Sequence, residues 1–269
     1  MIENLDQNQI IFIITAMSLS AVVTGFMAGF FGIGGGLIMV PILFYIFGFV
    51  GMEKSFIMHL AVGTSFSIIV PTSIISVLTH KKNGSVDVGV IKNYAIFVII
   101  GVLSGTIFAA ILHTKSLLLF FTTIVYLCGA YLLNIKDKTD NLKVNFNLIP
   151  RIILGFVSGF ISSTMGIGGA IMNVPILKYF GYPINKAIGS AAAIGSVISL
   201  FGALGFLITG SFLKANLPLS VGFINIPAFL IFIPITMVMA RVGANTVHKM
   251  DNSRLQRVFG IFLTIVGNI

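Results

Sequence analysis

Gly32-Ile33-Gly34-Gly35-Gly36 is the stretch that decides how this chain of 269 residues folds, and it has a second copy in Gly166-Ile167-Gly168-Gly169-Ala170. Each copy lies between apolar runs and is followed by Val-Pro-Ile-Leu, at residues 40–43 and 174–177. Glycine lowers helix propensity by about 1 kcal/mol relative to alanine and adopts positive-φ conformations. The two copies therefore predict breaks in apolar helices.

The composition predicts an all-α polytopic membrane protein. The chain is 57% hydrophobic and 9% charged, with a mean hydropathy of +1.08, whereas soluble domains carry about 25% charged residues. Most of its ten apolar runs approach the roughly 20 residues that span a bilayer, and the runs after the glycine copies are shorter. The runs are 10–31, 37–50, 56–78, 91–112, 116–133, 152–165, 170–182, 187–209, 219–240 and 255–269.

A repeat divides the sequence into two halves. Gly-Phe-x-x-Gly-Phe occurs before both glycine copies, at 25–30 and 155–160, and Ala61-Val62-Gly63-Thr64-Ser65 aligns with Ala187-Ile188-Gly189-Ser190-Ala191. We expect two transmembrane repeats of about five helical segments each. The first covers residues 1–134 and the second 151–269, with a polar cytoplasmic joint at 135–150.

The basic residues predict that the repeats are inverted. With one crossing for each run, all Lys and Arg except Lys54, Lys115 and Lys214 fall on one side, which the positive-inside rule assigns to the cytoplasm. The N-terminus is then outside. The basic connection 80–87 is inside and its equivalent, 210–218, is outside. Each connection keeps its side of the membrane whether the two runs around a glycine copy cross the membrane separately or form a re-entrant hairpin. Inverted repeats with broken helices are typical of secondary transporters.

The short run after each break predicts a half-helix that begins inside the protein. Residues 37–50 would span only about 21 Å. A helix starting at Gly35 or Gly36 would place unpaired N–H groups and about half a positive charge at membrane depth, which favours a compact oxyanion. The predicted substrate-binding residues are Gly34, Gly35, Gly36, Thr64, Ser65, Gly168, Gly169, Ala170, Asn173 and Ser190.

Several glycines and hydroxyls also fit a purely structural role. The Gly-x-x-x-Gly pairs that begin at residues 25, 101 and 155 are accounted for by close helix packing. The hydroxyls of Thr64, Ser65 and Ser190 can instead bond to the preceding helical turn. A membrane assembly protein whose glycines only pack helices is the alternative from a different class.

Few ionisable residues are available inside the predicted bundle. All seven carboxylates lie at chain ends or in loops, so a proton relay through a buried Asp or Glu is not expected. His59 is the candidate for H⁺ coupling, with an interfacial position as the alternative, while His80, His113 and His248 are expected in loops or at the interface. Na⁺ held by backbone carbonyls at the breaks and passive flow stay open too.

Catalytic and cofactor motifs are missing. The chain has no Walker loop, no His-Glu-x-x-His and no Cys or His cluster, so we expect no enzyme, no cofactor and no metal site. The basic residues lie in short connections rather than on one patch, which argues against nucleic-acid binding.

The doubled Gly-Ile-Gly-Gly with its Val-Pro-Ile-Leu tail, together with residues 79–87, resembles the TauE/SafE family of membrane permeases over nearly the whole chain. The resemblance implies a multi-pass protein of the prokaryotic plasma membrane that moves sulfite or organosulfonate anions. The alternative substrate is a carboxylate or another oxyanion. Direction, coupling ion and assembly as a homodimer stay open. The family signature falls on Gly32, Gly34, Gly35, Gly36, Pro41, Gly166, Gly168, Gly169 and Pro175, with departures at Ala170 and Ala191.

Overall fold

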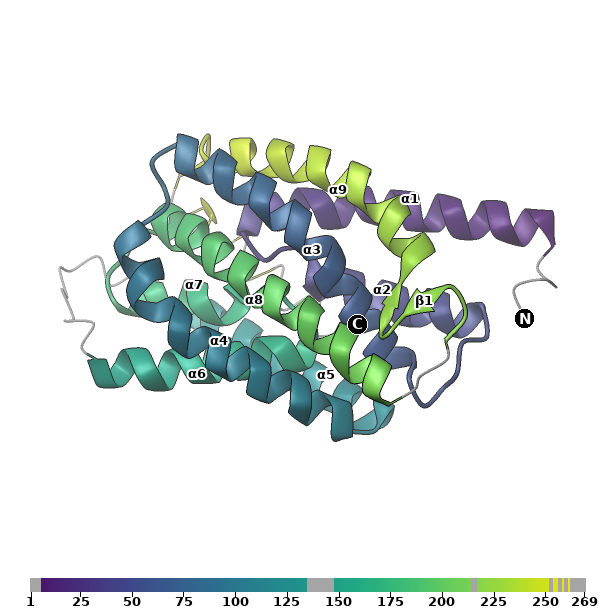
Figure 1. Ribbon diagram of the computed structural model, residues 1–269. Helices are drawn as coiled ribbons and strands as arrows, with labels where there is room; N and C mark the ends of the chain where they lie inside the picture. Colours follow the sequence, from purple (N-terminus) through teal and green to yellow (C-terminus); the bar gives the residue numbers. More distant parts are fainter. Residues whose placement is uncertain are drawn as a thin grey trace.

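The structure is a computed structural model that describes residues 6–134, 148–213 and 217–251, together with 254, 255, 258 and 261. Most of the joint predicted at 135–150, most of the last predicted run, 255–269, and Lys214 lie outside the described residues. Within the described part, the chain forms a bundle of α-helices with one short two-stranded hairpin (Figure 1).

The described helices follow the predicted runs, except that the run 219–240 begins with a β-hairpin and its helix is shifted toward the C-terminus, to Ile226–Val247. The first half contains α1 (Gln7–Phe31), α2 (Gly36–Phe49), α3 (Ile57–Lys82), α4 (Val88–Ile111) and α5 (Thr114–Asn134). The second contains α6 (Leu148–Met165), α7 (Ala170–Tyr179), α8 (Ile184–Phe212), the hairpin of β1 (Ser220–Val221) and β2 (Ile224–Asn225), and α9 (Ile226–Val247). Helices α1, α3, α4, α6, α8 and α9 are long and apolar enough to cross a membrane, which confirms the multi-pass, all-α prediction.

The glycine copies break the helices where the sequence predicts. Helix α1 ends at Phe31 and is capped by Gly32, with φ 68°, and α2 begins after Gly35, with φ 84°. In the second half, Gly166 and Gly169 have φ values of 74° and 81°, and α7 begins at Ala170. These left-handed conformations carry no Cβ penalty for glycine. The prediction that a short helix starts at Gly35 or Gly36 is confirmed.

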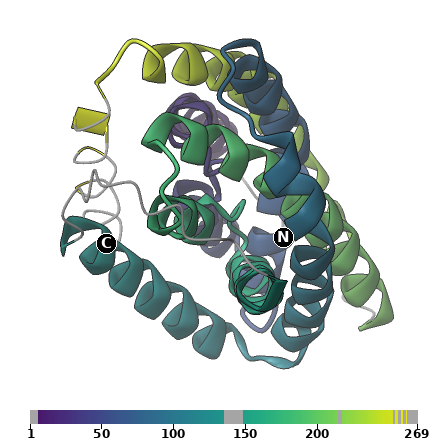
Figure 2. The ribbon, with the colours of Figure 1, turned by 90° about the vertical axis from the view of Figure 1, so that its left-hand side faces the viewer.

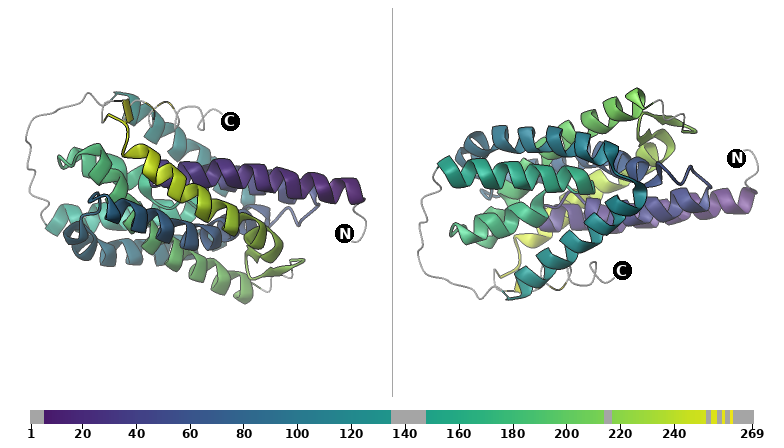
Figure 3. Two further views of the ribbon diagram at one scale, coloured as in Figure 1. Left: turned by 90° about the horizontal axis from the view of Figure 1, so that it is seen from above. Right: turned by 90° about the horizontal axis from the view of Figure 1, so that it is seen from below.

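Each broken pair of helices forms a hairpin. The rings of Phe12, near the start of α1, and Phe49, at the end of α2, are 6.1 Å apart, so α2 returns to the end of the bundle where α1 begins. Leu154, near the start of α6, and Tyr179, at the end of α7, line one pocket in the same way. Figure 3 shows the two hairpins entering the bundle from opposite ends.

The connections between helices gather at these two ends. One end carries the β1–β2 hairpin, and we call it the hairpin end. There, Thr114 Oγ1 donates to Ser55 O over 2.8 Å, and the ring of Phe56 lies 5.6 Å from that of Phe223 in the β1–β2 hairpin. The opposite end carries the connection 83–87 between α3 and α4, and we call it the loop end.

The contacts between helices follow the internal repeat. When each helix is replaced by its equivalent in the other half of the chain, the same pairs of helices are in contact. Helix α1 packs along α9 as α6 packs along α4, and α3 meets α9 as α8 meets α4. Likewise, α2 packs on α3 and α7 on α8, while α3 and α8 pack on each other. Helix α5 runs obliquely along the outside of these helices (Figure 2).

The predicted packing role of the Gly-x-x-x-Gly pairs is confirmed. A Cβ on Gly29 would lie 1.9 Å from Ala240 O, and one on Gly159 would lie 2.2 Å from Val98 O. A Cβ on Gly101 would come equally close to the backbone of α6. Because a side chain does not fit at such distances, glycine allows the backbones of α1 and α9, and of α4 and α6, to touch.

Candidate functional site

The two glycine breaks contact each other. A Cβ on Gly34 would lie 3.6 Å from the Cα of Gly168, and one on Gly168 would lie 3.4 Å from the Cα of Gly34. A Cβ on Gly36 would come within 2.3 Å of Gly166 O. All four glycines are buried. The fold therefore brings predicted site residues from both halves to one place, where the side chain of Ile69 also packs against Gly34.

The start of α2 carries unpaired N–H groups. The amides of Ile38 and Met39 donate to Gly35 O over 3.2 and 3.0 Å. For the amides of Gly36 and Leu37, the described part of the chain supplies no acceptor. These two donors and the helix dipole make the start of α2 electropositive.

The start of α7 has the same arrangement. The amides of Met172 and Asn173 donate to Gly169 O over 3.3 and 2.9 Å, while those of Ala170 and Ile171 meet no acceptor among the described residues. Two pairs of free donors thus belong to helices whose first residues are buried beside the contacting breaks.

Asn173 makes the second break more polar than the first. Its Nδ2 donates to Gly169 O over 2.7 Å, while its Oδ1 is buried and has no partner in the described residues. A Cβ on Gly169 would lie 3.5 Å from Ser162 Oγ, so a hydroxyl also lies close by. Met39 stands at the equivalent position of the first half. The two sides of the site therefore differ in chemistry.

Ser65 holds the second break from the other half of the chain. Its buried hydroxyl donates to Gly166 O over 3.0 Å. The equivalent residue, Ala191, has no hydroxyl to make the matching bond. A Cβ on Gly32 would lie 2.6 Å from Ile188 O, so the first break also packs directly on α8.

Thr64 takes part in what we call the hairpin-end contact. Its Oγ1 accepts from the backbone amide of Asn225 over 2.9 Å, and Asn225 is the N-cap of α9. The residue before it, Gly63, would place a Cβ 2.2 Å from Phe223 O. Helix α3 is thereby joined to the connection between α8 and α9.

Ser190 makes the equivalent loop-end contact. Its Oγ accepts from the backbone amide of Asp87 over 2.9 Å, and Asp87 is the N-cap of α4. Gly189 would place a Cβ 2.3 Å from Ser85 O. The hydroxyls of Thr64, Ser65 and Ser190 thus bond to other elements rather than to their own helical turns, and their role in binding substrate stays a prediction.

His59 is buried at the hairpin end and only 2% exposed. Its Nε2 lies 3.0 Å from Ala109 O in the last turn of α4, and its Nδ1 has no partner among the described residues. The rings of Phe56 and Phe223 lie 6.0 and 5.2 Å from the imidazole. Its proposed part in coupling is not tested by these contacts.

The expectation for His80 is wrong. This residue lies within α3 at the loop end and is fully buried. Its Nε2 is 3.0 Å from Gly29 O, and its Nδ1 is 3.1 Å from Nε2 of His248, the C-cap of α9. The sequence carried a signal for this position, because Ser76 and Thr72 precede His80 by one and two helical turns and so form one small polar face of α3 with it, which the structure buries.

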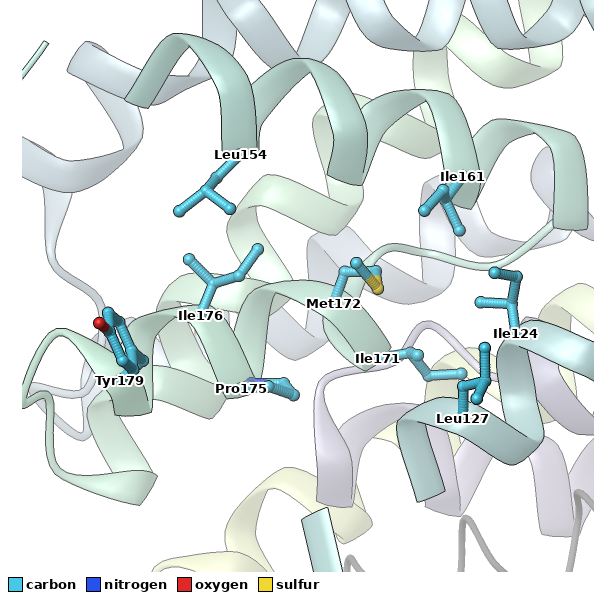
Figure 4. A pocket seen from close by; sticks show the side chains of 9 residues that line it. All are labelled: Ile124, Leu127, Leu154, Ile161, Ile171, Met172, Pro175, Ile176 and Tyr179. Carbon is cyan, nitrogen blue, oxygen red and sulfur yellow. The ribbon is translucent and has the colours of Figure 1, made fainter. Parts of the chain in front are cut away.

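Two apolar pockets lie on either side of α5. The larger of the two, about 470 Å³, lies between α5, α6 and α7 (Figure 4). The other, about 240 Å³, lies between α2, α3 and α5. Figure 4 shows aliphatic side chains pointing into the first, with Tyr179 at its edge. Such linings offer few donors to an anion, so the contacting breaks are the better candidate site.

Comparison with known proteins agrees with these features. The family described as sulfite exporter TauE/SafE matches residues 17–268. A probable membrane transporter protein of Haemophilus influenzae is 33% identical over 257 residues, which cover 95% of this chain and 97% of that protein. Another, from Methanocaldococcus jannaschii, is 27% identical over 255 residues, covering 91% and 90%. The probable membrane transporter protein YunE of Bacillus subtilis is 24% identical over 272 residues, covering 91% and 94%. No solved structure matches the chain.

Proposed function

Because this chain belongs to the sulfite exporter TauE/SafE family, we propose that it is a secondary transporter that moves a small sulfur-containing oxyanion, sulfite or an organosulfonate, by alternating access. It is a multi-pass membrane transporter and not an enzyme. The observation that carries the mechanism is the meeting of two broken helices from the two halves of the chain at one buried place. The relatives are bacterial and archaeal, which supports a place in the prokaryotic plasma membrane.

The pairing of helices supports two inverted repeats, residues 1–134 and 151–269. The pair of α1 and α9 is equivalent to the pair of α6 and α4, and the two helical hairpins, α1–α2 and α6–α7, enter the bundle from opposite ends. We place the loop end, with the joint 135–150, in the cytoplasm, because its connections are the basic ones, and the N-terminus outside. In such repeats, the substrate site lies where the repeats meet.

The anion is held by backbone N–H groups. The amides of Gly36 and Leu37 in α2, and of Ala170 and Ile171 in α7, have no acceptor in the described chain and lie at electropositive helix ends. Binding an oxyanion there satisfies buried donors that otherwise cost about 1 to 3 kcal/mol each. Of the predicted polar side chains, Ser65 and Asn173 bond to the second break, whereas Thr64 and Ser190 bond to the N-caps of α9 and α4.

The hairpin-end and loop-end contacts close the two faces of the transporter. Both are made in the same structure, and the breaks touch, so this state is closed at both ends. Access from outside requires the bond between Thr64 and Asn225 to open, and access from the cytoplasm requires that between Ser190 and Asp87 to open. Because the two contacts are equivalent, a single rocking movement opens one while it keeps the other.

The test is anion flux into proteoliposomes that contain the purified protein. Gly35→Leu and Gly169→Leu should abolish uptake of labelled sulfite and organosulfonate, because both positions have positive φ and no room. Gly48→Leu is the matched control, since Gly48 is an exposed position of α2 where a Cβ has only ordinary contact, 3.5 Å from Ile57. Thermal unfolding of each variant checks folding.

Wild-type flux by both Gly35→Leu and Gly169→Leu would refute the site. The same vesicles distinguish the substrates, because sulfite, thiosulfate, organosulfonates and carboxylates are offered in competition. If no anion in that panel is transported or raises the melting temperature of the wild-type protein, the alternative of a membrane assembly protein is favoured.

A further inference from the structure

Two histidines far apart in the sequence join three helices at the loop end. His80 belongs to α3, His248 caps α9, and the carbonyl that His80 contacts is that of Gly29 in α1. His80 is fully buried and His248 is partly exposed. Intramembrane ionisable groups are rare and costly, and they commonly mark ion or proton pathways.

The bonds of the pair determine where its protons are. A carbonyl only accepts, so Nε2 of His80 carries a hydrogen and donates it to Gly29 O. Nδ1 of the neutral His80 ring is then an acceptor, and His248 donates to it through its own Nε2–H over 3.1 Å.

The pair takes up one proton without rearrangement. A proton added to Nδ1 of the partly exposed His248 leaves the bond from its Nε2–H to His80 in place and makes it charge-assisted. A second proton, on Nδ1 of His80, would set two N–H groups against each other at the 3.1 Å that now separates the ring nitrogens. The rings would then have to separate, which moves α9 away from α3.

The histidine pair is connected to the first glycine break. Gly29 O lies in the last turn of α1, where carbonyls have lost their intrahelical partners because the helix ends at Phe31. His80 supplies the missing hydrogen bond. The C-terminal end of a helix also favours a positive charge. A proton on the pair therefore acts on the same break that carries the proposed anion site.

No carboxylate bonds to either ring among the described residues. Helix α1 has no titratable side chain, and the described charged residues of the other elements at the loop end are mainly basic. They are Lys81, Lys82, Asp87, Lys92, Arg151, Lys178, Lys186, Arg241, Lys249, Asp251 and Arg254. A second proton is disfavoured in such surroundings, whereas a bound anion offsets the charge of the first.

We propose that the pair of His80 and His248 is the proton site of the transport cycle, so that one proton crosses with each monovalent anion. The inference rests on the proposed transport function. Anion at the break and proton at the pair attract each other, and by linkage each raises the affinity for the other. The coupling ion is H⁺ rather than Na⁺, and the site is at the opposite end of α3 from His59.

The experiment uses methanesulfonate, which stays a monovalent anion between pH 5 and 8, so any pH dependence of its flux belongs to the protein. The membrane potential of the proteoliposomes is clamped. Either the pH is made lower outside than inside, or the Na⁺ concentration is made higher outside than inside. One proton per anion predicts accumulation by the wild-type protein of about tenfold for each pH unit. The Na⁺ gradient should cause none.

The variants are His80→Gln and His248→Gln. The amide of Gln at position 80 keeps a donor for Gly29 O but does not titrate. Both variants should lose accumulation driven by the pH difference, and the pH dependence of their residual exchange should disappear. His113→Gln removes an exposed histidine at the hairpin end and should accumulate the anion like the wild type. If His80→Gln does not fold, the partly exposed His248→Gln decides the result.

Accumulation driven by pH in both folded variants, or by Na⁺ alone in the wild type, would overturn the proton site and leave the transport function standing. Loss of accumulation in His59→Gln with full accumulation in His80→Gln would move the site to the hairpin end. No flux of any anion under any gradient would refute the transport function itself, and this inference with it.

Discussion

Replacing Thr64 by Val should open the hairpin end of the transporter more often and leave the loop end closed. The change keeps the size and shape of the side chain but removes the oxygen that accepts from the buried amide of Asn225. An unsatisfied buried donor costs about 1 to 3 kcal/mol, which raises the population of the open hairpin end by roughly 5- to 150-fold.

Hydrogen exchange followed by mass spectrometry measures the opening of this contact directly, because the exchanging amide of Asn225 is the donor of the hydrogen bond to Thr64. Peptides that cover residues 217–226 should exchange faster in Thr64→Val by the factor given above, while those that cover 83–90 keep their wild-type rate or slow down. Ser190→Ala is the mirror experiment. It should speed exchange at Asp87 and spare Asn225.

Equal acceleration at both ends in either variant would show global loosening and contradict separate closure of the two faces. Unchanged exchange at Asn225 in Thr64→Val would show that the hydroxyl does not hold the contact. Either result would refute the reasoning from the two equivalent contacts.

Three further predictions concern the helix packing, the anion site and the pH dependence of stability. Gly243→Ala would place a Cβ 2.1 Å from a backbone oxygen of α1, and this overpacking should lower the free energy of unfolding by about 1 to 3 kcal/mol. Gly48→Ala, at an open position, should raise it by up to about 1 kcal/mol. Thermal melts of the two variants measure the difference. Ser65→Ala removes the bond to Gly166 O and should weaken anion binding about fivefold in a titration, since a typical hydrogen bond contributes about 1 kcal/mol. Burial lowers the pKa of His248 below its ordinary 6.5 and outweighs the charge-assisted bond that a proton on this ring makes to His80. The contribution of His248 to the free energy of unfolding should therefore be complete above about pH 6.5 and be lost as the pH falls below it. Thermal melts of His248→Gln should show a smaller loss at low pH than the wild type, and an equal loss would contradict the assignment.

The sequence was sufficient for the features that arise within one segment. Length and apolarity predict a chain of membrane-crossing helices, and the conformational freedom of glycine predicts the breaks, because both depend on residues close together in the chain. The internal repeat also predicts that the breaks come as a pair. That they touch required the structure, since contact between residues 34 and 168 depends on how α3 and α8 pack.

Side-chain partners were beyond sequence reasoning. Thr64 bonds to a residue 161 positions away and Ser190 to one 103 positions away, and no local pattern encodes such pairs. The two lysines that follow His80 predict a basic connection, yet the packing of α3 against α1 and α9 buries His80 against Gly29 and His248.

The sequence by itself therefore determined that the chain crosses the membrane many times, where its helices break, and which family it resembles. Each of these follows from local conformational preference, apolar length or a motif read along the chain. The tertiary structure decided that the breaks meet, that equivalent contacts form at both ends, and that two histidines share a hydrogen bond. Those features depend on the distances between helices, which are set by packing over the whole bundle.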